Sequence, residues 1–178
     1  MSASAVVNSE ETFTVFFHEH RRPLRAYISK VYPAFDADDV TAATFTVAWS
    51  RFGDIPQECP RAWLIGTARN VVRNQARADR RRTQFVDRLV FDRPRVTADM
   101  QDDWLLTEQV QQLETAMASL SKPDQELLLM AAWAELSVAE IGVALGISTN
   151  AATVRLHRAR QRLRTAMQLQ TAPEGRVG

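Results

Sequence analysis

The chain has 178 residues but only one cysteine, Cys59, and six glycines. A single cysteine excludes a disulfide within the chain, and such a composition is typical of proteins from a reducing compartment. No uninterrupted apolar stretch approaches the length that crosses a bilayer. The first ten residues also lack the basic segment and apolar run of a signal peptide. We therefore expect a soluble, cytoplasmic protein without a membrane contact.

The sequence also lacks the motifs of an enzyme or a metal site. It contains no phosphate-binding glycine loop, zinc-ligand cluster or nucleophile elbow. His18 and His20 are two residues apart and do not share a helix face. The adjacent acids Asp38 and Asp39 are more typical of a helix start than of a catalytic pair. We expect no catalytic residue, no cofactor and no metal.

Arginine, in contrast, is abundant and gathers in two places. The formal net charge is only +1, yet residues 61–82 contain seven arginines against one acid, and residues 155–164 contain five arginines and no acid. Two basic segments in a nearly neutral chain predict two separate contacts with an anionic partner.

The second arginine cluster belongs to a stretch with the pattern of a helix-turn-helix. Ser137 and Glu140 have the spacing of a capping box at the start of one helix. Gly146 suits the turn that ends this helix, and Ser148 can cap the next one. The apolar positions of the second helix step by four, three and four residues: Ala152, Leu156, Ala159 and Leu163.

Polar and basic residues lie off this apolar stripe, as in a helix that enters a DNA major groove. Amide, hydroxyl and imidazole groups suit base edges, and arginines suit phosphates. The candidate DNA contacts are Asn150, Thr153, Arg155, His157, Arg158 and Arg160. The alternative is a capped helical hairpin with a solvated basic face.

The other periodic segments also predict helices. The first is expected to have its cap at Ser9 and to run to Val31, with Pro23 kinking or dividing it. The second opens at Asp36 and ends near Gly53. A third helix follows a proline-bounded loop, with its apolar residues inward and its arginines outward.

The periodic pattern dissolves between residues 83 and 103 and then resumes, with one further helix starting at Ser121. The predicted fold is all-α. We expect two small helical domains at 9–82 and 104–170, joined by a flexible linker at 83–103.

Two sets of motifs run through these domains. The N-terminal set is Asp36-Ala-Asp-Asp-Val with Phe45 and Trp49, then Arg61-Ala-Trp-Leu-Ile-Gly-Thr-Ala-Arg-Asn. The C-terminal set is Leu120-Ser-Lys-Pro-Asp-Gln-Glu-Leu-Leu-Leu, Leu136-Ser-Val-Ala-Glu-Ile, Leu145-Gly-Ile-Ser and Arg155-Leu-His-Arg-Ala-Arg. In this order they resemble regions 2 and 4 of the extracytoplasmic-function sigma factors of bacterial RNA polymerase.

The resemblance implies that region 2 binds the β′ clamp of core RNA polymerase and melts the minus-ten promoter element. Region 4 then reads the minus-thirty-five element and meets the β flap. The implied partners are core polymerase and promoter DNA, with an anti-sigma factor as a candidate third. The polymerase-binding residues would be Asp38, Asp39, Thr44, Phe45 and Trp49.

The resemblance also assigns roles in DNA binding. The minus-ten element would be bound by Arg61, Asn70, Arg73, Asn74, Arg77 and Arg80. Asn70, Asn74 and the loop at 53–59 are the candidates for capturing an unstacked base. The six candidate contacts in the helix-turn-helix would bind the minus-thirty-five element.

The chain departs from the family pattern at two places. Ala42 and Ala43 stand where the family usually has Gln and an acid, on the helix that docks on the clamp. Residues 150–152 are Asn-Ala-Ala where Gly-Thr-Val is common. The promoter preference of the family therefore does not carry over.

Two other functions compete with this interpretation. A DNA-binding regulator of the response-regulator output type would share the helix-turn-helix and bind duplex DNA without polymerase. A helical adaptor would bind only proteins, but arginines clustered beside polar readers disfavour it.

Overall fold

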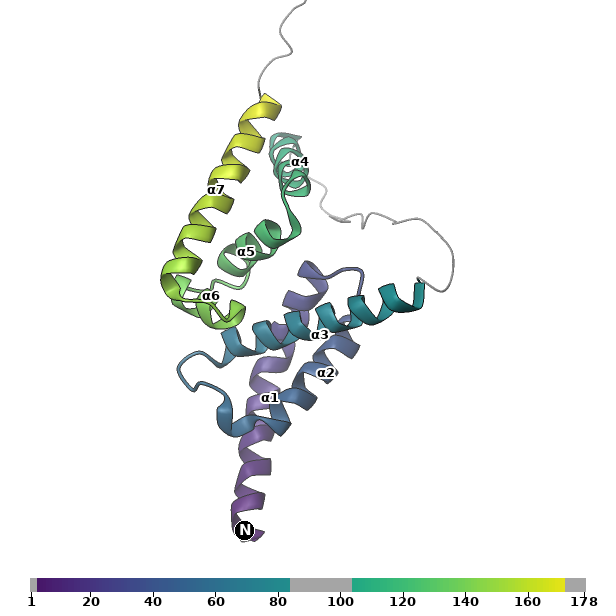
Figure 1. Ribbon diagram of the computed structural model, residues 1–178, viewed down its shortest axis with the longest axis vertical. Helices are drawn as coiled ribbons and strands as arrows, with labels where there is room; N and C mark the ends of the chain where they lie inside the picture. Colours follow the sequence, from purple (N-terminus) through teal and green to yellow (C-terminus); the bar gives the residue numbers. More distant parts are fainter. Residues whose placement is uncertain (1–2, 84–103, 172–178) are drawn as a thin grey trace, which may run out of the picture. The chain divides into compact units, whose positions relative to one another are not determined.

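The computed structural model describes residues 3–83 and 104–171, which form helices without any strand. These helices divide into two compact units, the first containing α1 to α3 and the second most of α4 to α7 (Figure 1). The all-α class and its two helical regions confirm the predicted fold. The predicted linker lies outside the described residues, except for Thr83.

The N-terminal unit is a packing of three helices in which α2 contacts both α1 and α3. Its elements are α1 (Ala3–Val31), α2 (Ala37–Ser50), the 3-10 turn η1 (Phe52–Asp54) and α3 (Pro60–Thr83). All three α-helices contribute buried apolar side chains, among them Leu24, Ile28, Val40, Ala48, Leu64, Ile65 and Ala68.

The first helix is longer and less interrupted than predicted. Ser9 lies inside α1 rather than at its cap, and Pro23 does not divide it. A proline in a helix interior costs about 3 kcal/mol. Leu24 and Ile28, just after the proline, are buried, and each such side chain contributes roughly 1.5–3 kcal/mol. Tertiary packing therefore outweighs the local preference of proline, and α1 runs as one element past α2 and α3 (Figure 1).

The start of α2 was predicted correctly, but its end was not. Asp36 is the N-cap, with its side chain accepting from the backbone N–H groups of Asp38 and Asp39. The helix ends at Ser50 rather than near Gly53, because the chain then tightens into η1.

The C-terminal unit consists of α4 (Trp104–Ser119), α5 (Lys122–Ala132), α6 (Val138–Leu145) and α7 (Thr149–Thr171). The long helix α7 contacts both α4 and α5. Buried apolar residues include Ala116, Leu127, Leu128, Met130, Leu156 and Ala159. The apolar repeat of α4 is only partly buried, since Val110 and Leu113 are exposed while the small Ala116 is enclosed.

Two polar side chains fix the turn between α4 and α5. Ser121 caps α5 as predicted, with its hydroxyl accepting from the N–H of Asp124. Gln125 was not predicted to have a role. Its Nε2 donates to the carbonyl oxygens of Met117 (2.8 Å) and Leu120 (2.9 Å). The Met117 carbonyl also accepts from the backbone N–H of Leu120 (3.1 Å), so the amide of Gln125 adds bonds that tie α5 to the C-terminal end of α4.

The turn between α5 and α6 has a left-handed residue that is not glycine. Glu135 has φ +51°, a conformation that costs a residue with a Cβ about 1–2 kcal/mol. Glycine avoids this cost, but it lowers the free energy of unfolding by roughly 0.4–1 kcal/mol because it gives the unfolded chain more conformational entropy. We expect Glu135→Gly to raise the free energy of unfolding by about 0.5–1 kcal/mol, measured by urea denaturation followed by circular dichroism.

Glu114→Gly is the matched control, because Glu114 is exposed within α4. This change should lower stability by roughly 1 kcal/mol. A loss of stability in both variants would show that Glu135 carries no strain.

Candidate functional site

The predicted helix-turn-helix is formed by α6, the turn after it and the start of α7. The backbone N–H of Ser137 donates to Oε2 of Glu140 (2.8 Å), and the N–H of Glu140 donates to Oγ of Ser137 (3.3 Å). Gly146 has φ +65°. A Cβ at Gly142 would lie 3.0 Å from the carbonyl oxygen of Ile147. The capping box and the glycine turn are therefore confirmed, and Gly142 is a further residue that the tight turn favours.

The second helix of the motif has the predicted two-sided character. Oγ of Ser148 accepts from the N–H of Ala151 (3.2 Å) and so caps α7. Ala152, Leu156 and Ala159 are buried. All six candidate DNA contacts on this helix are exposed: Asn150, Thr153, Arg155, His157, Arg158 and Arg160.

Four residues define the face of α7 opposite the buried stripe. Asn150, Val154 and His157 follow at helical spacings of four and three, and Arg158 lies beside them. At 3.6 residues per turn, Arg155 and Arg160 lie on the two flanks of this face. Such an arrangement fits a helix in a major groove, with base edges ahead and a phosphate backbone on either side.

Two details of α7 were not predicted from the sequence. Val154 is 41% exposed at the centre of this face, and its apolar side chain matches the methyl group of thymine. Thr153 lies on the flank, and its hydroxyl donates to the carbonyl of Thr149 (2.9 Å). Its oxygen can therefore only accept from a base.

The arginines of α7 are not equivalent. Nη1 of Arg162 donates to both carboxylate oxygens of Asp124, at 3.0 and 2.9 Å. Within the described ranges, Arg155, Arg158 and Arg160 form no ion pair. These three guanidinium groups are available for phosphates or bases, whereas Arg162 is held on α5.

The first arginine cluster forms an exposed face on α3. Asn70, Arg73, Asn74, Arg77 and Arg80 are exposed and recur at helical spacing on one side of the helix. A hollow of about 430 Å³ is lined by Asn74, Arg77, Arg80 and Arg81, of which Arg81 was not predicted. Arg61 is exposed too, but it lies nine residues before Asn70 and thus about half a turn away from this face.

The loop at 53–59 is separated from Asn70. It begins inside η1, and Gln57 and Glu58 are exposed in it. Asn70 lies ten residues into α3, about 15 Å along the axis from Pro60. The loop and Asn70 would therefore contact different nucleotides rather than enclose one base together.

The five candidate polymerase contacts on α2 divide into buried and exposed residues. Thr44 and Phe45 are buried at 0% and 4% exposure, and the Thr44 hydroxyl donates to the carbonyl of Val40 (2.7 Å). They shape the helix from inside rather than offering a contact. The exposed members are Asp38, Asp39 and Trp49.

Trp49 packs against one aromatic ring of α1. Its ring contacts that of Phe13 edge to face, with centroids 4.8 Å apart. Phe13 also packs on Phe52 (5.1 Å), and Phe17 packs on Phe45 (4.8 Å). Even so, Trp49 stays 46% exposed, and aromatic residues of this kind often anchor protein interfaces.

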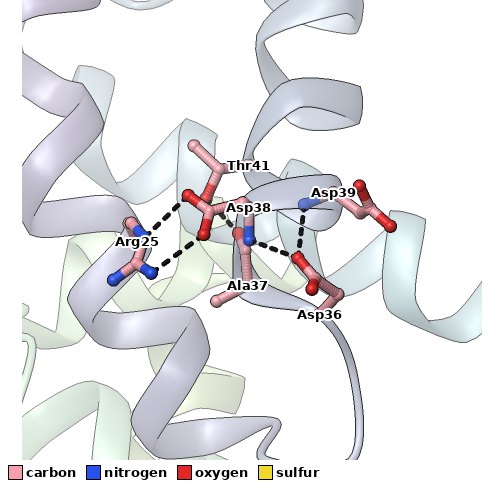
Figure 2. Close-up of polar contacts among 6 residues, drawn as sticks. All are labelled: Arg25, Asp36, Ala37, Asp38, Asp39 and Thr41. Atoms are coloured by element: carbon pink, nitrogen blue, oxygen red, sulfur yellow. Dashed lines mark hydrogen bonds and ion pairs between the residues drawn. The ribbon is translucent and has the colours of Figure 1, made fainter.

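Asp38 is already paired within the N-terminal unit. Nε of Arg25 donates to its Oδ1 (2.7 Å), and Nη2 of Arg25 donates to its Oδ2 (2.9 Å) (Figure 2). This hydrogen bonding holds the pKa of Asp38 below its usual value. Any stabilisation from the pair is therefore present above pH 3.8 and is lost as the pH falls through the lower pKa of the folded state.

Two segments of the chain match family models. Residues 16–82, with α2 and the basic face of α3, match Sigma-70 region 2. Residues 110–163, with the helix-turn-helix, match Sigma-70, region 4. The chain belongs to the sigma-70 family. Members of this family regulate transcription and are not enzymes, and the resemblance to sigma factors is confirmed.

The fold of this sigma factor is similar to that of two solved structures. One is the sigma factor RpoE in complex with the anti-sigma factor NepR from Bartonella quintana, with a TM-score of 0.67, 21% identity, and 89% of this chain and 98% of that chain covered. The other is CnrH in complex with the cytosolic domain of CnrY. Its TM-score is 0.60 and its identity 24%, and the match covers 95% of this chain and 96% of that chain. No curated protein matches the chain.

Among the helices that the structure describes, none is long and apolar enough to cross a bilayer. The roles of the individual site residues in this sigma factor, and its domain limits at 9–82 and 104–170, stay predictions.

Proposed function

We propose that this sigma factor binds core RNA polymerase and directs it to promoters. In this proposal α7 reads the minus-thirty-five element, while α3 binds and melts the minus-ten element. One observation supports it most. This chain of the sigma-70 family has an exposed basic face on α7 and, in a separate unit, a second exposed basic face on α3. Two such faces can hold two promoter elements at once.

The contacts of the two faces differ in kind. Arg155 and Arg160 would bind phosphates on either side of the groove, and His157 and Asn150 would meet base edges. On α3, arginines would track the backbone of an opened strand, while Asn70 would hydrogen-bond an unstacked base.

Core polymerase would be bound through α2. The exposed side of α2 has Asp39 near its start and Trp49 near its end, with Ala42 between them. We propose that this side docks on the β′ clamp, and that the region 4 unit meets the β flap. An anti-sigma factor is a further proposed partner, which the RpoE–NepR complex supports by analogy.

A binding titration separates this function from its alternatives. Labelled full-length chain is titrated with core polymerase, and promoter duplex is then added to the chain with and without core. We expect nanomolar to micromolar core binding and promoter binding that requires core. A regulator would bind the duplex tightly without core, and an adaptor would bind no DNA.

The exposed Val154 gives a prediction about specificity. Contact with a thymine methyl buries about one methyl group, worth about 0.8 kcal/mol or roughly fourfold in affinity. On a duplex that the holoenzyme selects from a random library, one thymine-to-deoxyuridine change should weaken binding by this factor. In Val154→Ala the same change should have no effect.

Val110→Ala is the matched control, since Val110 is 44% exposed but lies on α4. This variant should keep the full sensitivity to deoxyuridine. If the wild-type holoenzyme is insensitive at every thymine of the upstream element, Val154 does not read a methyl group.

A further inference from the structure

The two adjacent aspartates at the start of α2 have different surroundings. We propose that Arg25 neutralises Asp38 in an ion pair within the protein, and that Asp39 presents the free carboxylate to a cation of core polymerase. This inference rests on the proposed docking of α2 on the polymerase. It assigns a role to Arg25, which no sequence motif indicated, and removes Asp38 from the direct contacts.

The geometry of the pair supports a structural role for Asp38. Both of its carboxylate oxygens accept from Arg25, at 2.7 and 2.9 Å, in a two-pronged arrangement. Arg25 lies on α1, thirteen residues earlier in the chain, so the pair ties the first turn of α2 to α1. A planar guanidinium matches a carboxylate in this way, which fixes direction as well as distance.

Asp36 has a separate task at the same helix end. Its Oδ1 accepts from the backbone N–H groups of Asp38 (2.8 Å) and Asp39 (2.9 Å). This bonding satisfies two donors that the first turn of a helix leaves free. Asp36 is thus committed to the backbone of its own helix.

Asp39 is the remaining carboxylate. In Figure 2 its side chain points away from Arg25, and only its backbone nitrogen is joined to Asp36. No described residue forms an ion pair or a side-chain hydrogen bond with its carboxylate. The three acids are therefore used differently: Asp36 caps the helix, Asp38 is paired with Arg25, and the carboxylate of Asp39 is free.

The charges explain why a partner would distinguish the two neighbours. A cation that approaches Asp38 also meets the guanidinium of Arg25, so attraction and repulsion nearly cancel. A cation that approaches Asp39 meets an uncompensated carboxylate. Because the Arg25–Asp38 pair is about half exposed, its contribution to folding is small. The main consequence of the pair is that the uncompensated negative charge at the start of α2 lies on Asp39 rather than on Asp38.

Charge-neutralising variants of the full-length chain test this assignment in titrations with core polymerase at low and physiological salt. Asp39→Asn should weaken binding about tenfold, the usual loss for a hydrogen bond to a charged group, and should reduce the salt dependence. Asp38→Asn should stay within about twofold of wild type. Arg25→Gln should bind at least as tightly as wild type and with a steeper salt dependence, because it frees a second carboxylate.

Two further variants exclude trivial explanations. Glu114→Gln removes one negative charge from the exposed side of α4 and should bind like wild type. The exchange Arg25→Asp with Asp38→Arg keeps a pair between α1 and α2 and should preserve both the circular dichroism spectrum and the affinity.

The outcomes are distinguishable. If Asp38→Asn weakens binding as much as Asp39→Asn, or if the exchanged pair binds poorly while folded, the assignment is wrong. Either result leaves the proposed function intact as long as the wild-type chain binds core. A wild-type chain that does not bind core overturns the proposed function, and this inference with it.

Discussion

Replacing Asn70 by alanine is expected to reduce open-complex formation at least tenfold while leaving closed-complex binding nearly unchanged. Unstacking a base costs a few kcal/mol, and a site that captures the base must recover this energy through hydrogen bonds. Asn70 is exposed on the basic face of α3, and its amide can both donate to and accept from a base edge. Potassium permanganate reactivity of promoter thymines measures the open fraction, and gel retardation measures closed-complex binding.

A promoter with a mismatched minus-ten element provides the control for this prediction. There the bases are already unpaired, so the defect of Asn70→Ala should shrink to a few-fold. A variant that opens the fully paired promoter as well as wild type does would remove Asn70 from the melting site. An equal loss of closed and open complexes would instead make it an ordinary backbone contact.

Removing the phosphate-binding arginines of α7 should have the second large effect. In Arg155→Gln with Arg160→Gln, the plot of log affinity against log salt should become shallower by about 0.9 per lost contact. The loss should be the same for all sequences, because phosphates carry no base information. His157→Ala should instead cost roughly 1–3 kcal/mol at one base-pair position. Titrations of holoenzyme on a panel of single-substitution promoters measure both effects.

Arg162→Gln is the matched control on the same helix. It removes one positive charge, against two in the double variant, but Arg162 is held by Asp124, so the salt dependence should not change. A shallower slope for Arg162→Gln, or an unchanged slope for the Arg155 and Arg160 variant, would show that the phosphate contacts lie elsewhere on α7.

The parts of the fold that the sequence predicted well depend on neighbouring residues. The capping box of Ser137 and Glu140, the cap at Ser121 and the turn at Gly146 each involve groups within a few positions of one another. Hydrogen bonds of this kind are encoded locally, so spacing and residue type suffice to predict them.

The parts that the sequence missed depend on distant residues. Arg25 pairs with Asp38 thirteen positions away, and Arg162 pairs with Asp124 thirty-eight positions away. The periodicity of apolar residues along the sequence does not indicate such a pair. Pro23 was expected to kink or divide the first helix, but α1, which packs against α2, is not divided there.

The buried side of α2 was hard to predict for a different reason. Its sequence consists largely of Ala, Thr and Val on all sides, so apolar and polar faces differ little. The resemblance to sigma factors placed Thr44 in the polymerase contact, and nothing in this composition indicated that it is fully buried. Ala42, in contrast, is exposed, and its small side chain leaves Asp39 and Trp49 as the main groups that α2 offers to a partner.

The central claim, that this sigma factor opens promoters together with core polymerase, is tested most directly by permanganate footprinting. The promoter selected by the holoenzyme is incubated with core alone, with the chain alone, and with both. We expect reactive thymines in the minus-ten element only when both are present. If the chain alone binds the duplex tightly and the thymines stay unreactive with core added, the chain acts as a duplex-binding regulator and the claim is contradicted.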